Sequence, residues 1–184
     1  RVNGVKAWIT HGGRADFYST MVRTSDDRAK GISCLLVDAG TPGLTSAPPE
    51  RKMGANSSPT AQMIFEDVHV PADRLMGAEG AGFSVALAAL DAGRLGIAAC
   101  SVGLAQAALD AAVAYAGERV QFGRPIAEFQ GVAFLLADMA TAVAGARALY
   151  LHAARLKDAG LSFGTDAAMA KLAASDAVMR VTTD

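Results

Sequence analysis

The chain contains few of the residues that build metal centres and disulfide frameworks. Its 184 residues include two cysteines, Cys34 and Cys100, and three histidines, and all five lie far apart in the sequence. Zinc, haem and redox motifs place such residues at short, fixed spacings. The sequence therefore indicates neither a metal site nor a disulfide framework, and both cysteines are expected to be buried structural thiols.

An excess of charge of either sign is also missing. The formal net charge is −1, with 19% charged and 52% hydrophobic residues. This balance offers no electrostatic footprint for nucleic acid and predicts a well-cored soluble protein. The most apolar segment, residues 85–117, is interrupted by charged and polar residues, so we expect a buried helix rather than a membrane span. No targeting segment is visible.

Common nucleotide-binding and hydrolase motifs are absent as well. Neither a GxxxxGK[ST] loop nor a GxSxG elbow occurs. Gly77, Gly80 and Gly82 precede an expected helix, but they do not form GxGxxG and no βαβ unit surrounds them. A flexible linker is the better interpretation of these three glycines.

The rest of the sequence divides into two regions with different hydrophobic patterns. Up to about residue 72 short apolar runs alternate with turns, and Pro71 follows the last of them. The expected strands lie at residues 17–22, 32–37 and 62–70. A Gly-, Pro- and Ser-rich loop occupies residues 40–59. The pattern predicts a small β-sheet domain at residues 1–75.

Residues 76–184 are predicted to be helical. In the first helix, apolar residues at three- and four-residue steps predict a buried stripe. That stripe consists of Phe83, Leu87, Leu90, Ile97, Leu104 and Ala108. A second helix is expected over residues 127–158 with Gly160 as its C′ residue, and Thr165-Asp166 is expected to cap a third. The fold class is thus α+β, a small β-sheet domain followed by an antiparallel helical bundle.

Three polar or aromatic groups stand out. Arg119, Gln121, Arg124 and Gln130 cluster where two helix ends meet, which suits a phosphate, although a solvated interhelix corner would look the same. Arg94 falls on the expected apolar stripe with Asp91 three residues earlier. Their pair either holds helices in register or lines a ligand pocket. Trp8, the only tryptophan, would ordinarily be a core residue.

These groups coincide with a family pattern. The run Arg119-x-Gln121-Phe122-Gly123-x-Pro125-Ile126, followed by Phe129-Gln130, resembles the signature of flavin-dependent acyl-CoA dehydrogenases. Residues 90–98 (LDAGRLGIA) and 167–173 (AAMAKLA) are similar to the short-chain, butyryl branch. Trp8-Ile9-Thr10 matches the family's Trp-Ile-Thr element, while His11 stands where Asn is common. The resemblance extends over the whole chain.

The resemblance implies a site built from three groups of residues. Trp8, Ile9 and Thr10 would lie against the isoalloxazine of FAD. Asp91 and Arg94 would line the acyl-CoA substrate pocket. The remaining cofactor-binding residues would hold the flavin across a dimer interface, with Arg119 at its pyrophosphate; they are Arg119, Gln121, Phe122, Phe129 and Gln130.

The implied activity is FAD-dependent α,β-dehydrogenation of an acyl-CoA to a trans-2-enoyl-CoA, as in fatty acid β-oxidation. Electrons would pass to electron-transferring flavoprotein. A homodimer or homotetramer, located in the cytoplasm or the mitochondrial matrix, is expected. An acyl-CoA oxidase, a nitroalkane-oxidase-like enzyme and a non-catalytic scaffold subunit remain alternatives.

The catalytic base is expected outside this chain. Most family members carry a glutamate in a loop beyond the point matched by Asp184, and a minority carry it at the position of Gly93, where glycine cannot serve. Both chain ends read as interruptions of a longer protein. The chain is therefore interpreted as the middle β domain and part of the C-terminal helical domain.

Overall fold

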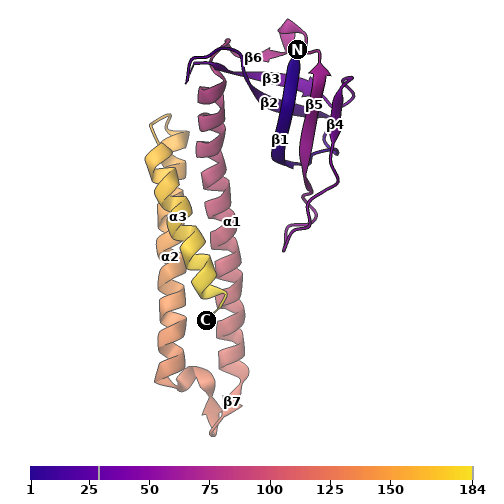
Figure 1. The fold of residues 1–184 in the computed structure, drawn as a ribbon. Coiled ribbons are helices and arrows are strands. Elements are labelled where there is room, and N and C mark those ends of the chain that lie inside the picture. Colours follow the sequence, from indigo (N-terminus) through magenta and orange to yellow (C-terminus); the bar gives the residue numbers. More distant parts are fainter. Residues whose placement is uncertain (29, 184) are drawn as a thin grey trace. The chain divides into compact units, whose positions relative to one another are not determined.

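The computed structural model describes residues 1–28 and 30–183. It consists of two compact units, Arg1–Leu87 and Ala88–Asp184. Strands build the first unit and helices the second (Figure 1). This confirms the predicted α+β class.

Two antiparallel three-stranded sheets form most of the first unit. One has the order β1-β5-β4 and the other the order β2-β3-β6. Their bounds are β1 Val2–Thr10, β2 Phe17–Arg23, β3 Ile32–Asp38, β4 Leu44–Ser46, β5 Thr60–Val68 and β6 Leu75–Met76. The three predicted strands correspond to β2, β3 and β5. Because β1 and β2 each pair on one side only, each is an edge strand.

The core of this unit lies between the two sheets. Its buried members are Tyr18, Val37, Met63, Phe65 and Val68. On β2 the buried Tyr18 and Thr20 alternate with the exposed Phe17 and Ser19, as the two-residue period of a strand requires. The alternation therefore selects which β2 side chains reach the core.

The connection from the sheet to α1 (Gly82–Glu118) is anchored to β3, where the sequence had suggested a flexible linker. The Gly80 N–H donates to Ser33 Oγ at 2.9 Å, and Ser33 Oγ lies 2.8 Å from Thr24 Oγ1. A β-carbon at Gly82 would come within 2.5 Å of the Ser33 carbonyl carbon. The glycines are there to permit this close approach.

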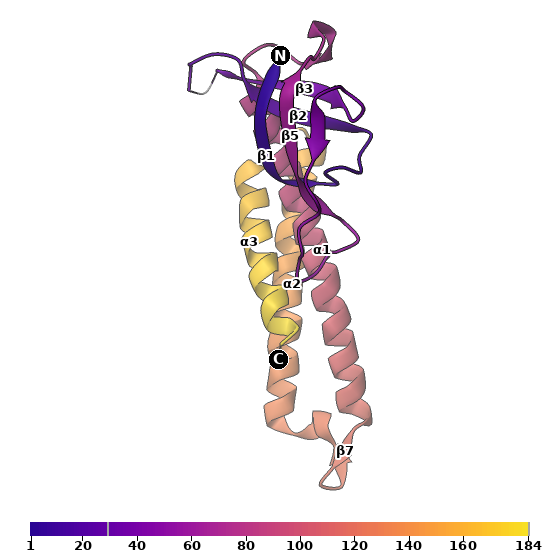
Figure 2. The same ribbon diagram turned by 45° about the vertical axis from the view of Figure 1, so that its right-hand side comes forward.

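The second unit is an antiparallel arrangement of helices. It contains the continuation of α1, a hairpin of β7 (Val120–Gln121) and β8 (Arg124–Pro125), and a 3-10 turn at Ile126–Glu128. Helices α2 (Gln130–Asp158) and α3 (Gly164–Val181) follow. Figures 1 and 2 show α2 and α3 side by side along most of α3.

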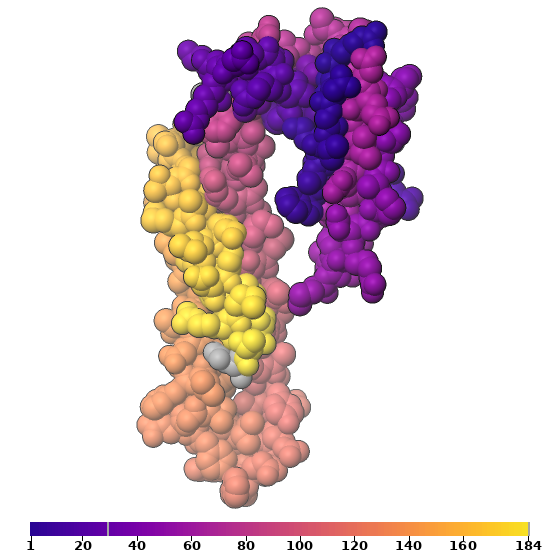
Figure 3. Space-filling model, in the orientation of Figure 1, coloured from indigo at the N-terminus to yellow at the C-terminus, as the bar shows by residue number. Residues whose placement is uncertain are grey.

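The helical core is made largely of alanine and valine. Its α1 members are Ala98, Val102, Ala105 and Leu109, which pack with Met139, Val143 and Ala146 of α2 and with alanines of α3. Such small side chains let helices approach closely, and the space-filling view shows α3 fitted against α2 (Figure 3).

The stripe predicted for α1 is wrong. Phe83, Leu87, Leu90, Ile97 and Leu104 are all exposed in this structure. Because apolar residues occur all round α1, three- and four-residue steps can be traced along more than one of its faces. The large apolar residues suggested one face of α1, whereas the contacts in the helical core are made by Ala98, Val102, Ala105 and Leu109.

The ends of α2 and α3 test two predicted caps. Gly160 has φ +69° and donates to Lys157 O, while Leu161 N–H donates to Leu156 O. These are the two bonds of a Schellman motif, so the Gly160 prediction is confirmed. The predicted Thr165-Asp166 cap is wrong, because α3 begins at Gly164 after Phe163 and no side chain caps it.

Two further sequence expectations are altered. Cys34 is buried and Cys100 is exposed, and neither forms a disulfide, so only Cys34 is the expected buried thiol. Burial raises the pKa of the Cys34 thiol. By length and composition alone, α1 and α2 could each cross a membrane, a property that core helices of soluble bundles share. The expectation that neither helix spans a membrane stays a prediction.

Candidate functional site

A β-bulge in β1 determines where Trp8 lies. Lys6 pairs with Met63 and Ile9 with Ala61, so three steps along β1 match two along β5. Trp8 takes up the extra residue with φ +53° and is 77% exposed. The bulge turns the indole out of the sheet, so Trp8 is not a core residue.

This conformation is costly for tryptophan. The left-handed region is unfavourable for side chains with a β-carbon, and bulky residues adopt it rarely. Such strain is typical of ligand contacts. Ile9 turns the other way and packs against the core of the first unit. Adjacent residues of the Trp-Ile-Thr element thus have different surroundings.

Thr10 and Ile9 line a cavity of about 470 Å³ between β1 and β2. His11 lies at the same end, and Phe17, Tyr18 and Met21 contribute from β2. Trp8 is not among the lining residues. Apolar side chains make up much of the wall, and Thr10, Tyr18, Lys6 and the neighbouring Ser19 and Thr20 add polar groups, a composition that suits a planar heteroaromatic ligand.

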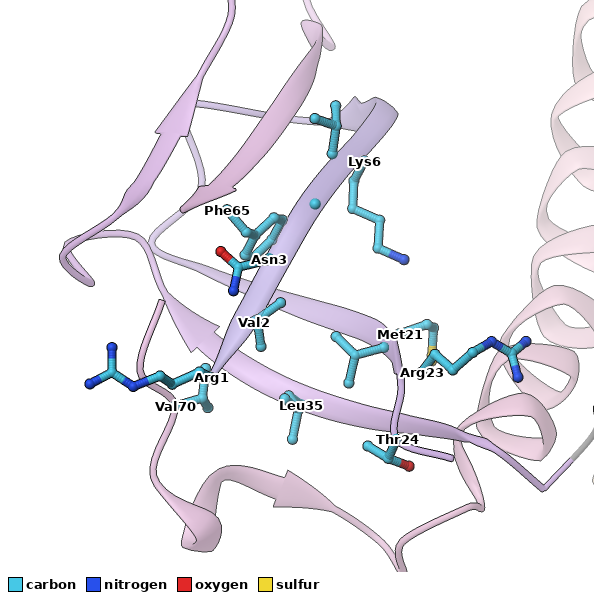
Figure 4. Close-up of a pocket in the computed structure, with 13 residues that line it drawn as sticks. Arg1, Val2, Asn3, Lys6, Met21, Arg23, Thr24, Leu35, Phe65 and Val70 are labelled. Atoms are coloured by element: carbon cyan, nitrogen blue, oxygen red, sulfur yellow. The ribbon is translucent and has the colours of Figure 1, made fainter. Parts of the chain in front are cut away.

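A second cavity, of about 510 Å³, runs along the other part of the same strands. Residues 1–6 of β1 and 21–24 at the end of β2 line it, together with Leu35, Phe65 and Val70 (Figure 4). Lys6 lines both cavities, and its side chain runs toward the region of Met21 in Figure 4. No predicted site residue lines this second cavity.

Asp91 and Arg94 form the predicted ion pair, one turn apart on α1. Their side chains are 32% and 36% exposed, so the pair is half-buried rather than buried as predicted. The Asp91 carboxylate also packs against the first residue of α3, since a β-carbon at Gly164 would come within 3.1 Å of Asp91 Oδ2. Asp91 therefore fixes Arg94 and adjoins a helix N-terminus, which favours a negative charge.

The hairpin of β7 and β8 presents the third group of predicted residues. Phe122 and Gly123 have φ +53° and +83°, the pattern of a two-residue type I′ turn. Phe122 is 93% exposed at the tip. Its ring stands 6.1 Å from that of Phe129, at 84°. An exposed, strained aromatic at a hairpin tip indicates a contact surface.

Arg119 and Gln130 lie at the two ends of this hairpin segment. Arg119 follows the last residue of α1, and its carbonyl accepts from the Ile126 N–H at 2.8 Å. Gln130 opens α2, whose N-terminus carries no side-chain cap. Both side chains are exposed, and the Gln121 side chain donates to its neighbour's carbonyl, Val120 O, at 2.8 Å. A free guanidinium near free helix-terminal N–H groups can bind a phosphate.

Helix geometry separates the two groups on α1. Arg94 and Arg119 are 25 residues apart, and at 1.5 Å per residue they lie about 37 Å apart along the helix axis. The Asp91–Arg94 pair and the hairpin therefore do not meet around one site within this chain.

Sequence reasoning grouped Arg124 with the phosphate ligands but missed its aromatic partner. The Arg124 guanidinium lies 4.3 Å from the Phe129 ring centroid, so it is engaged in a cation–π contact. Gly164 and Tyr18 were also missed. The contact between Arg124 and Phe129 could not be inferred from their five-residue spacing, because the segment between them is neither one helix nor one strand.

The chain matches two family models. The acyl-CoA dehydrogenase middle domain matches residues 1–68, and the acyl-CoA dehydrogenase C-terminal domain matches residues 80–184. The fold and the two matches define a two-domain flavoenzyme-type architecture. The chain belongs to the acyl-CoA dehydrogenase family, which confirms the resemblance noted in the sequence.

Individual relatives agree with this assignment. An acyl-CoA dehydrogenase of Bacillus subtilis is 50% identical over 184 residues, which cover all of this chain and 48% of the relative. The solved structure of butyryl-CoA dehydrogenase from Megasphaera elsdenii aligns with a TM-score of 0.93 at 47% identity, over 98% of this chain and 48% of that chain.

A chain in a structure described as the electron transferring flavoprotein of Acidaminococcus fermentans also has a TM-score of 0.93, at 48% identity. It aligns over 99% of this chain and 48% of its own length. The present chain thus spans about half the length of the curated relatives it matches.

Proposed function

We propose that the protein containing this chain is an FAD-dependent acyl-CoA dehydrogenase that converts a short acyl-CoA to its trans-2-enoyl-CoA. The observation that carries the proposal is the Trp8 bulge beside the cavity of Thr10. It holds an aromatic ring in a strained, exposed conformation in the residue pair Trp8-Ile9, directly before Thr10, whose side chain lines a largely apolar cavity. Family membership and the butyryl-CoA dehydrogenase neighbour support the substrate class.

The residues of the first unit fit a flavin ring system. Trp8 offers an exposed indole face for the isoalloxazine, and Thr10 offers a hydroxyl at the cavity rim. When bound, FAD supplies the acceptor for the substrate hydride. This chain would orient the ring through Trp8 and Thr10 and exclude water through the apolar walls of the cavity.

The hairpin would serve the flavin of a second copy. Arg119 lies about 37 Å along α1 from Arg94. One copy of the chain therefore cannot bring both residues to the reactive end of the same flavin. Arg119 would pair with the pyrophosphate, assisted by Gln130, while Phe122 and Phe129 pack against the nucleotide. Gln121 adds a hydrogen-bonding side chain. This requires at least a homodimer, and a homotetramer agrees with the family.

Asp91 and Arg94 would form the wall of the acyl pocket. A guanidinium beside the catalytic glutamate would keep that carboxylate ionised, as removal of a proton requires. We place the glutamate outside this chain, because no acidic side chain occupies position 93. The arrangement gives Arg94 a positioning role that depends on Asp91.

Three coarser features complete the proposal. The domain boundary lies at residues 75/76, between the regions that match the two family models. The partners are an acyl-CoA and electron-transferring flavoprotein, the latter supported by the Acidaminococcus neighbour. The protein acts in the cytoplasm or the mitochondrial matrix, with α1 and α2 as bundle helices.

The test is turnover by the complete, flavin-loaded protein with butyryl-CoA. We expect enoyl-CoA formation that depends on electron-transferring flavoprotein or an artificial acceptor, with little hydrogen peroxide. Stoichiometric peroxide in air would identify an oxidase. Flavin binding without any turnover across acyl-CoA chain lengths would instead identify a non-catalytic subunit.

A further inference from the structure

The Tyr18 hydroxyl contacts the turn after β1 at two points, in addition to backbone hydrogen bonds within the turn. The Gly13 N–H donates to Tyr18 Oη at 2.9 Å, and Tyr18 Oη donates to the His11 carbonyl at 3.3 Å. Tyr18 lies on β2 and is 7% exposed. One hydroxyl thus bridges two residues of the turn that directly follows Thr10, and both its donor and its acceptor capacities are used.

The turn needs such support because its backbone is unfavourable. His11 has φ +56° and Gly13 has φ +72°. The His11 N–H donates to Pro59 O at 2.7 Å, which ties the start of the turn to the loop before β5. The Arg14 and Ala15 N–H groups bond the His11 carbonyl from within the turn, and the Tyr18 hydroxyl adds a tie from the turn to β2.

The same side chain also borders the cavity of the candidate flavin site. Tyr18, Thr10 and His11 all line it, and Thr10 is bonded directly to His11. A shift of the His11–Gly13 turn therefore changes the direction in which the Thr10 hydroxyl points. Tyr18 fixes that turn from a rigid strand, which is how an active-site group is held within a fraction of an ångström.

We propose that Tyr18 is a positioning residue of the flavin site, whose hydroxyl sets the orientation of Thr10 toward the isoalloxazine. The proposal rests on the placement of the flavin at Thr10 given above. It assigns no direct contact between the Tyr18 hydroxyl and the cofactor, because that hydroxyl is occupied by Gly13 and His11.

The test is a double-mutant cycle in the complete, flavin-bound protein with Tyr18→Phe, Thr10→Val and both together. Tyr18→Phe keeps the buried ring and removes only the hydroxyl. We expect each single variant to shift the flavin absorption bands and reduction potential, and Tyr18→Phe to weaken flavin retention about fivefold, the scale of one neutral hydrogen bond. In the Thr10→Val background Tyr18→Phe should add no further shift.

Two controls separate the possible outcomes. Tyr115→Phe removes an exposed hydroxyl from α1 and should leave the spectrum unchanged. Gly13→Ala reaches the same turn from the side of Ser46, which a β-carbon would contact, and should shift the bands as Tyr18→Phe does.

Unchanged bands and potential in Tyr18→Phe, with Thr10→Val shifted, would overturn the positioning role and leave the flavin placement standing. A shift of equal size in both backgrounds would also overturn it, because Tyr18 would then act independently of Thr10. A silent Thr10→Val would overturn the flavin placement and this proposal together.

Discussion

The carboxylate of Asp91 lies against Gly164, the first residue of α3, while it pairs with Arg94 on its own helix. The absence of a side chain at Gly164 leaves room for this approach. The N-terminus of α3 has no side-chain cap, so its free N–H groups and dipole favour the negative charge beside them. Asp91 is thus held between α1 and the N-terminus of α3, and its ion pair holds the Arg94 side chain in place.

The first prediction concerns Arg94. Arg94→Lys keeps the positive charge but loses the planar fork that holds Asp91, so the cation will lie differently. We expect kcat of the complete enzyme to fall roughly tenfold or more, the scale of a small misplacement at a reacting centre. Flavin content, measured by absorbance per protomer, should stay near that of the parent.

Arg155→Lys is the matched control, since Arg155 is exposed on α2 and forms no ion pair in the described part of the chain. It should leave kcat unchanged. If Arg94→Lys keeps parental turnover, the Asp91–Arg94 pair serves only helix packing. A matching loss of flavin and turnover would place Arg94 at the cofactor instead.

The second prediction tests Arg119. Arg119→Ala removes an exposed guanidinium proposed to pair with the flavin pyrophosphate. Flavin retention should weaken by about 1.5–3 kcal/mol, the scale of a hydrogen bond to a charged group. The measurement is flavin per protomer after extensive dialysis, with Arg124→Ala as control because that guanidinium stacks on Phe129. Equal flavin loss in both variants would contradict the specific role of Arg119.

Much of the fold could be predicted from the sequence because local rules decided it. The alternation in β2 and the C′ glycine at Gly160 are set by backbone geometry within a few residues. The contacting face of α1 could not be predicted, since its apolar residues surround the helix and its few polar residues do not mark one side. The start of α3 was also missed, because the helix begins one residue before Thr165 without a side-chain cap, and its neighbour there, Asp91, comes from a distant segment.

The candidate site shows the same division. The Asp91–Arg94 pair follows from three-residue spacing on a helix. The exposure of Trp8 does not follow from its sequence, because a bulge moved it out of the two-residue alternation. Arg124 was grouped with phosphate ligands although its partner is an aromatic ring beyond a turn. Contacts between residues on opposite sides of a bulge or a turn cannot be predicted from the period of a helix or a strand.

The third prediction uses the strain at Trp8. Glycine adopts φ +53° without steric cost, so Trp8→Gly should change the free energy of unfolding of the flavin-free protein by about 1 kcal/mol or less. A buried tryptophan replaced by a small residue would cost about 3–5 kcal/mol. Flavin retention should weaken at the same time. A loss of about 3–5 kcal/mol in urea unfolding would show instead that Trp8 is a core residue.

The last prediction sets helix propensity against close packing at Gly82. Gly82 is the first residue of α1, and replacing a helical glycine by alanine ordinarily stabilises a protein by up to about 1 kcal/mol. Here the new β-carbon would come within 2.5 Å of the Ser33 carbonyl carbon and 2.8 Å of the Cys34 nitrogen, which are backbone atoms of β3 and cannot rotate away. We expect Gly82→Ala to destabilise the protein by about 1–3 kcal/mol, the usual cost of overpacking.

Gly145→Ala is the matched control for Gly82→Ala. Gly145 lies inside α2, and a β-carbon there would have no atom within 4 Å, so the same substitution should stabilise the protein by up to about 1 kcal/mol. Urea unfolding followed by circular dichroism gives both changes, and they should have opposite signs. A Gly82→Ala variant at least as stable as the parent would show that the start of α1 is free to move away from β3, and the anchoring through Ser33 and Gly80 would then be wrong.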